Sequence, residues 1–162
     1  MGRVRSLACL GAALAVASCG GGGGDGEERR RQPGPAPRVD AADVRVVRGW
    51  ADTLRRGDVR GAARYFALPT IVSNGTRPIR LDTRPAVRFF NRTLPCGAKV
   101  IDSEPAENGF FIVTFRLTER PGPGSCGSGT GETARTAFRV RDELITDWLR
   151  VEDVESAPGT PA

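Results

Sequence analysis

The chain has 162 residues, enough for one domain of ordinary size. Its net charge is +5, but Lys99 is the sole lysine. Heavy use of arginine beside abundant Gly, Ala and Pro indicates a GC-rich genome more than a phosphate-binding surface, so we expect no nucleic-acid partner. The chain also has no histidine, which excludes the usual general base near neutral pH and the commonest metal ligand. We expect no metal and no cofactor.

The N-terminus has the pattern of an export signal. Arg3 and Arg5 precede an apolar run from Leu7 to Val16, which has signal-peptide length and is too short to span a bilayer. The segment Val16-Ala17-Ser18-Cys19 closes this run and resembles the bacterial lipobox. That resemblance implies cleavage before Cys19 and acylation of its thiol, which would tie the protein to membrane lipid. The alternative is an ordinary secretory signal with a chance cysteine.

These patterns divide the chain into four segments. Residues 1–18 are the expected lipoprotein signal peptide, and residues 19–39 a Gly-, Pro- and Arg-containing linker that starts at Cys19. Residues 40–155 are the expected folded domain, and residues 156–162 a disordered tail. We therefore expect an extracytoplasmic protein held at a bacterial cell membrane by lipid.

The four cysteines follow from this division. Cys9 leaves with the signal peptide and Cys19 is acylated, so Cys96 and Cys126 remain in the folded domain. Two cysteines outside the cytosol favour a disulfide, and two thiols without histidine are too few for structural zinc. We expect a Cys96–Cys126 disulfide that closes a loop of about 30 residues.

Helical periodicity marks the first half of the domain. A first helix is predicted from Asp40 or Ala41 to Arg56, with Asp40 as N-cap and Gly57 as the stop. A second, short helix is predicted from Asp58 through Phe66, ended by Leu68-Pro69. A third opens at Asp82 or Thr83, carries Pro85 in its first turn and runs to about Leu94.

Strand signals occupy the rest. Residues 70–73 and 76–81 flank Asn74-Gly75, a dipeptide typical of a type I′ hairpin turn. Further strands are predicted over residues 98–104, 110–119, 134–141 and 144–152, with a turn at Asn108-Gly109. The alternation of Phe111, Val113 and Phe115 with Ile112, Thr114 and Arg116 indicates a strand of period two. The fold class is therefore α+β.

Two stretches resemble the nuclear transport factor 2-like superfamily, which includes SnoaL-like and ketosteroid-isomerase-like proteins. "GWADTLRRGDVRGAARYF" is similar to its first two helices, and "RTAFRVRDELITDWLRVED" to its closing hairpin. The resemblance covers residues 41–153. It implies three N-terminal helices packed on a strongly curved, mostly antiparallel sheet, a cone whose mouth admits a small apolar ligand.

The resemblance also implies what this chain lacks. The tyrosine, carboxylate base and buried acid of the ketosteroid isomerases fall approximately on Trp50, Asn74 and Thr136. Asn and Thr side chains cannot exchange a proton as those acids do, and an indole cannot replace a phenol. We expect a non-catalytic domain that binds a small apolar ligand or a protein partner. The expected pocket residues are Trp50, Tyr65, Asn74, Phe111, Thr136, Phe138 and Trp148.

Two other functions stay open from the sequence. One is a SnoaL-like enzyme (isomerase, cyclase or hydratase) whose carboxylates we cannot place. The other is an interaction module with a filled cone, which forms a homodimer through the open sheet face or binds an envelope protein. On the third predicted helix, Arg84, Arg88 and Arg92 form a basic stripe that could face lipid headgroups or acidic envelope polymers, or simply solvent.

Overall fold

The computed structural model describes residues 38–151. The expected signal peptide, Cys19, the linker up to residue 37 and the tail lie outside the described residues, so their roles stay predictions. No helix within residues 38–151 combines the length and apolar content that a membrane crossing requires.

The first helix, α1 (Ala41–Arg55), begins and ends as its sequence predicts. The carboxylate of Asp40 accepts a hydrogen bond from the backbone N–H of Ala42 at 2.7 Å, which satisfies one of the free donors of the first turn. Gly57 follows the last turn with φ of +86°, a conformation that glycine adopts without a steric penalty. Val47, Trp50 and Leu54 give this helix its buried stripe.

The second helix is shorter than predicted. α2 spans Val59–Ala62, with Asp58 accepting from the N–H of Gly61 at 2.7 Å, and a 3₁₀ turn, η1 (Ala63–Tyr65), follows it. Phe66 already begins strand β1 (Phe66–Ser73), so the prediction of helix through Phe66 was wrong. Leu68-Pro69 lies inside that strand as a cis peptide. Pairing of β1 with its neighbours outweighs the local helical pattern there.

The predicted hairpin forms, but its turn differs. β1 pairs antiparallel with β2 (Ile79–Leu81), with Thr70 opposite Leu81. The connection covers residues 74–78, and positive φ occurs at Gly75 but not at Asn74, so this is not a two-residue type I′ turn. Pro78 has no N–H to donate to the ladder, and the second strand therefore starts after it.

Helix α3 (Arg84–Thr93) agrees with its prediction. Thr83 caps it by accepting from the N–H of Ala86 at 3.3 Å, and Pro85 stands in the first turn. The N-terminal position suits proline, because the N–H it lacks has no helical partner there.

Four longer strands complete one sheet, near the predicted ranges. They are β3 (Gly97–Pro105), β4 (Phe111–Thr118), β5 (Thr133–Arg141) and β6 (Leu144–Val151), with single turns η2 (Glu107–Gly109) and η3 (Gly127–Gly129) between them. The strand order is β2-β1-β6-β5-β4-β3, and only the β1–β6 pair is parallel. The predicted turn at Asn108-Gly109 is confirmed, with positive φ at both residues.

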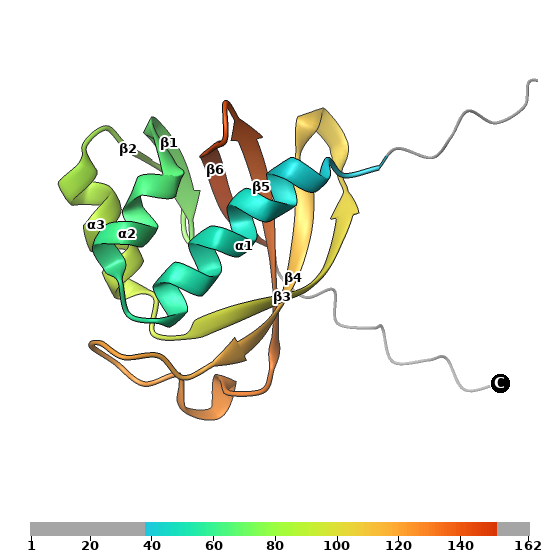
Figure 1. Cartoon of the computed structure of the whole chain (residues 1–162). Helices are drawn as coiled ribbons and strands as arrows, with labels where there is room; N and C mark the ends of the chain where they lie inside the picture. The colour runs from blue at the N-terminus through green and yellow to red at the C-terminus, as the bar shows by residue number, and fades with distance from the viewer. Residues whose placement is uncertain (1–37, 152–162) are drawn as a thin grey trace, which may run out of the picture. The chain divides into compact units, whose positions relative to one another are not determined.

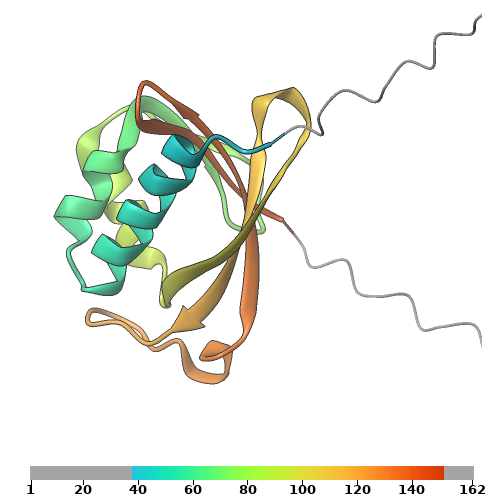
Figure 2. The same cartoon turned by 45° about the vertical axis from the view of Figure 1, so that its right-hand side comes forward.

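The sheet curves around the helices, and the core fills its concave side. Figures 1 and 2 show α1 lying across this concave face, with α2 and α3 beside it. Phe111, Val113 and Phe115 of β4 are buried there, whereas the alternate residues face the outer side of the sheet. Trp50 is at the centre of the core, packed edge-to-face on Phe66 at 5.9 Å between ring centroids. The predicted α+β architecture, with helices on a curved, mostly antiparallel sheet, is confirmed.

Candidate functional site

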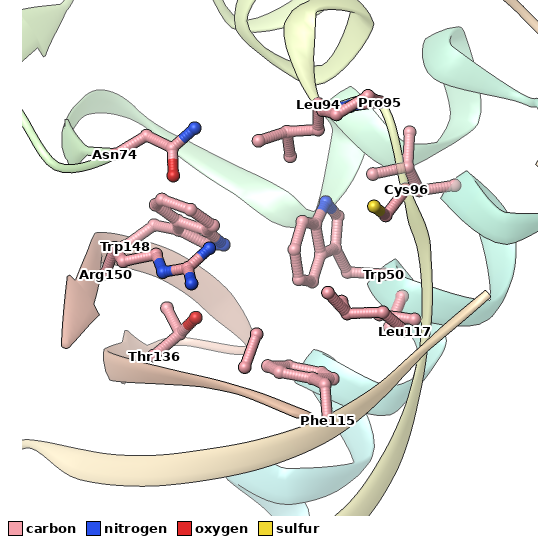
Figure 3. A pocket seen from close by; sticks show the side chains of 14 residues that line it. Trp50, Asn74, Leu94, Pro95, Cys96, Phe115, Leu117, Thr136, Trp148 and Arg150 are labelled. Carbon is pink, nitrogen blue, oxygen red and sulfur yellow. The ribbon is translucent and has the colours of Figure 1, made fainter. Parts of the chain in front are cut away.

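A cavity of about 190 Å³ lies between α1 and the concave face of the sheet. Its lining comes from α1, from the segment that joins α3 to β3, from β3, β4, β5 and β6, and from the loop after β1. Most of the lining is aromatic or aliphatic. Its polar side chains are those of Asn74, Thr136 and Arg150 and the indole N–H groups of Trp50 and Trp148. Figure 3 shows these residues around the hollow.

The structure brings four of the seven predicted pocket residues to this cavity: Trp50, Asn74, Thr136 and Trp148. Phe111 and Phe138 do not line it. They face each other across the β4–β5 ladder and stack at 6.0 Å between centroids, further along the two strands than the lining residues of those strands.

Tyr65 is the third predicted pocket residue that the cavity lining does not include. It packs beside Gly49 of α1, where a side-chain Cβ would come within 2.8 Å of its hydroxyl oxygen. The small residue at position 49 thus makes room for the tyrosine ring against the helix.

Sequence reasoning missed Arg150 and the aliphatic side of the lining. Arg150 stands two residues after Trp148 on the same strand, so period two places both side chains on one face of β6. That signal was present in the sequence. Leu94, Pro95 and Cys96 reach the cavity from the α3–β3 connection, whose path no local pattern fixes.

The indole N–H of Trp50 is used in a hydrogen bond within the fold. Its Nε1–H donates to Oδ1 of Asn91 at 2.8 Å, and Nδ2 of Asn91 donates to the carbonyl of Val87 at 2.9 Å. Asn91 is fully buried, and this bond ties α1 to α3. Trp50 therefore offers the cavity its ring face but no hydrogen-bond donor.

Trp148, unlike Trp50, makes no hydrogen bond through its indole N–H in the described part of the chain. Its side chain is buried, with 5% of the residue exposed, and its Nε1–H has no hydrogen-bond partner. Four buried side-chain atoms lack partners within residues 38–151, and Trp148 Nε1 is the only one of them that belongs to a cavity-lining residue. A buried donor without an acceptor costs about 1–3 kcal/mol, so the position is one that a ligand acceptor would improve.

The charge of the lining is positive. Arg150 is the charged residue among the lining positions, and they include no Asp or Glu in the part of the chain described. Figure 3 places the Arg150 guanidinium beside Trp148 and Thr136. Thr136 faces Arg150 directly across the β5–β6 ladder, which explains why these two side chains share a face.

A second arginine, Arg120, has a purely structural role. It is 7% exposed, and its guanidinium donates to the carbonyl of Leu94 at 2.9 Å and to those of Arg92 and Pro121 at 3.1 Å. These acceptors include the free carbonyls at the end of α3, where a cation is favourable. Burial lowers the pKa of Arg120 from its usual value.

The predicted disulfide is confirmed. Cys96 and Cys126 are bonded, with Cα atoms 4.5 Å apart, and Cys96 lies in the cavity wall. The disulfide joins the start of β3 to the loop between β4 and β5. Glu119 organises the same loop, because its carboxylate accepts from the N–H groups of Cys126 and Gly127.

The three arginines of the predicted basic stripe have different surroundings. Arg84 is half-buried and donates to the carbonyls of Ala63 and Phe66, so it links α3 to the first residues of η1 and of β1. Arg88 is half-buried and Arg92 is exposed. Nowhere in residues 38–151 do three or more His, Cys, Asp or Glu side chains gather as a metal ion would require.

No protein-family model matches the sequence, and no curated protein matches it. Solved structures do match in fold. A candidate polyketide cyclase from Sinorhizobium meliloti is 16% identical, with a TM-score of 0.50 over 66% of this chain and 94% of its own. A nuclear transport factor 2-like protein of unknown function from Cytophaga hutchinsonii is 8% identical, with a TM-score of 0.52 over 72% and 95%.

A protein from a soil-derived mobile gene cassette is 13% identical, with a TM-score of 0.50 over 68% of this chain and 88% of its own. At these identities the likeness concerns the fold, which hosts many unrelated functions. The order of helices and strands, the curved sheet and these structural neighbours agree. The chain therefore has the cone fold of the nuclear transport factor 2-like superfamily, as the sequence resemblance predicted.

Proposed function

We propose that the domain binds a small, largely apolar molecule inside the cone. The observation that carries this proposal is the cavity of about 190 Å³, lined mainly by aromatic and aliphatic side chains. An apolar cavity of about 150 Å³ is large enough to hold benzene. Binding sites of this kind combine an apolar wall with a few placed polar groups, and this cavity has that composition.

Binding is better supported than proton-transfer catalysis. A cyclase or isomerase of this fold would need a group that exchanges a proton with its substrate. The polar groups of the described lining are arginine, asparagine, threonine and indole side chains, and they include no carboxylate, imidazole, thiol or amine to act as general acid or base. The cavity also argues against the interaction module with a filled cone, because space remains for a guest.

Filling the cavity from its own wall tests the proposal. Ala134 of β5 lines the cavity, whereas Ala137 of the same strand points to the outer face of the sheet. We expect toluene to raise the melting temperature of the wild-type protein and of Ala137→Phe, but not of Ala134→Phe. Equal shifts in all three proteins would place toluene elsewhere, and no shift in wild type would leave the cavity without a ligand role.

For the whole chain we propose a lipoprotein of the bacterial cell envelope, anchored through acylated Cys19. The support is the apolar run before Val16-Ala17-Ser18-Cys19 and the Gly-rich linker after it. Cys19→Ala should move the protein out of the membrane fraction, and Cys9→Ala, which changes a cysteine of the signal peptide itself, should not. Membrane retention of Cys19→Ala would disprove the lipid anchor.

A further inference from the structure

The cavity has two chemically different ends. In Figure 3, Asn74, Trp148, Arg150 and Thr136 lie on one side of the hollow, and Leu94, Pro95, Cys96 and Leu117 on the other. The first group carries side-chain hydrogen-bond donors, and the second carries none, because Cys96 is part of the disulfide. A ligand that fills the cavity therefore meets donors at one end only.

Three of the donors at the polar end share one face of the sheet. Trp148 and Arg150 are two residues apart on β6, and Thr136 faces Arg150 across the ladder, so the register of β5 and β6 brings these three positions together. Trp148 Nε1–H is buried and has no acceptor. The backbone pairing sets these three positions on one face before any ligand arrives, and the buried Trp148 ring is already ordered there, which lowers part of the entropic cost of binding.

Charge decides which acceptor fits best. Arg150 is the charged side chain of the lining, and no ion pair within residues 38–151 involves it. A guanidinium binds a carboxylate with two parallel hydrogen bonds, and a charge-assisted hydrogen bond is about twice as strong as a neutral one. The indole N–H and the Thr136 hydroxyl can donate to the same oxygen atoms. A neutral ketone or alcohol would use only part of this cluster.

We propose that the ligand is a small monocarboxylate whose apolar body fills the aliphatic end of the cavity. Its carboxylate accepts hydrogen bonds from Trp148 Nε1–H and the Arg150 guanidinium. This inference rests on the proposed ligand-binding function and names the chemical class of the ligand. The cavity volume of about 190 Å³ limits the body to about one substituted ring or a short branched chain.

Benzoate, benzyl alcohol and toluene test the proposal, because they share a ring and differ in the group it carries. Calorimetric titration of the purified protein should show benzoate binding at least about tenfold more tightly than benzyl alcohol. Trp148→Phe and Arg150→Gln should each weaken benzoate binding about tenfold or more, and should leave toluene binding within about threefold. Arg150 is exposed, so its replacement keeps the fold even if Trp148→Phe does not.

Arg141→Gln is the matched control. It removes the same charge from an exposed position at the end of β5, outside the cavity lining, and should leave benzoate affinity unchanged. Equal affinities for benzoate and benzyl alcohol, or a loss in Arg141→Gln equal to that in Arg150→Gln, would overturn the carboxylate proposal. Toluene binding that Ala134→Phe abolishes would then still support the cavity as a ligand site. If benzoate shows no preference and toluene does not bind in the cavity, both the carboxylate proposal and the ligand-binding proposal are wrong.

Discussion

The two tryptophans of the cavity wall make the most informative comparison in this molecule. Trp50 and Trp148 are both buried, and their rings pack edge-to-face with centroids 6.3 Å apart. On the helix side, Trp50 donates its hydrogen bond to Asn91. On the sheet side, Trp148 donates to no group within the described residues. Burial and residue type are therefore the same on both sides, and only the state of the donor separates a structural role from a recognition role.

The same contrast holds for two arginines, Arg120 and Arg150. Arg120, beside the end of α3, donates to backbone carbonyls, whereas Arg150 of β6 is exposed and lines the cavity. On the helix side, the donors of Trp50 and Arg120 link parts of the fold. On the sheet side, the donors of Trp148 and Arg150 make no hydrogen bond within residues 38–151 and can bind a ligand. If this distinction is right, substitutions on the two sides must affect different properties, stability on one and ligand affinity on the other.

The largest expected effect is the loss of Arg120. Arg120→Met leaves the carbonyls at the end of α3 buried without a donor, and each such group costs about 1–3 kcal/mol. We expect the free energy of unfolding to fall by about 4 kcal/mol, measured by urea denaturation. Arg116→Met, an exposed control on β4, should change it by less than about 1 kcal/mol. A small effect at Arg120 would mean that solvent replaces its hydrogen bonds.

The disulfide gives the next largest effect. Replacing both Cys96 and Cys126 by alanine removes a link between residues 30 apart in the sequence. The unfolded chain then gains loop entropy, and the stability should fall by about 3.5 kcal/mol. Urea denaturation with and without a thiol reductant checks this, since the reductant should lower the midpoint of the wild-type protein and leave that of the double variant unchanged. A wild-type midpoint insensitive to complete reduction would contradict the prediction.

The tryptophan pair itself tests the comparison more finely. Trp50→Phe removes the partner of a fully buried amide oxygen, and we expect it to cost about 2–3 kcal/mol of stability. Trp148→Phe loses ring area but also removes an unpaired donor, so we expect a loss of about 1 kcal/mol or less. Thermal or urea unfolding of the two variants gives the difference. Equal losses would show that the Asn91 hydrogen bond adds nothing to the fold.

Much of the fold followed from local patterns in the sequence. The period of α1 and α3, their capping residues and the alternation along β4 set these elements within one or two residues. The end of α2 did not follow, because Phe66 joins a strand whose partners lie far away in the chain. Its β6 partner, Ile145, belongs to the last strand, and no local propensity contains that pairing.

The cavity was predictable in part for a similar reason. Strand alternation and the resemblance together indicated the face that carries Thr136 and Trp148. They did not show how far along that face the cavity extends, so Phe111 and Phe138 were included although neither lines it. Whether an indole N–H is paired depends on a residue 41 positions away in the case of Trp50 and Asn91. Sequence patterns of period two or 3.6 carry no information of that kind.

The smallest expected effect concerns Glu119. It asks whether the hydrogen bonds of an exposed polar group also contribute to the structure. Hydrogen bonds from the Cys126 N–H and the Thr130 hydroxyl, then from Gly127 and Ser125, lower the pKa of Glu119 below its usual 4.5. The ionised carboxylate therefore holds the loop at pH values above the unfolded pKa, and this contribution is lost as pH falls through the lower folded pKa. The carboxylate is fully exposed, so the effect should be local to the loop.

Amide hydrogen exchange checks this prediction, with exchange rates corrected for their intrinsic pH dependence. The protection factors of the Cys126 and Gly127 amides, which donate to Glu119, should be constant at higher pH and fall as the pH decreases below 4.5 in the wild-type protein. In Glu119→Gln they should be low throughout and nearly independent of pH, because the amide cannot ionise. Protection that stays constant in the wild-type protein would mean that the disulfide alone orders the loop. The hydrogen bonds that Glu119 accepts would then add nothing to the order of the loop.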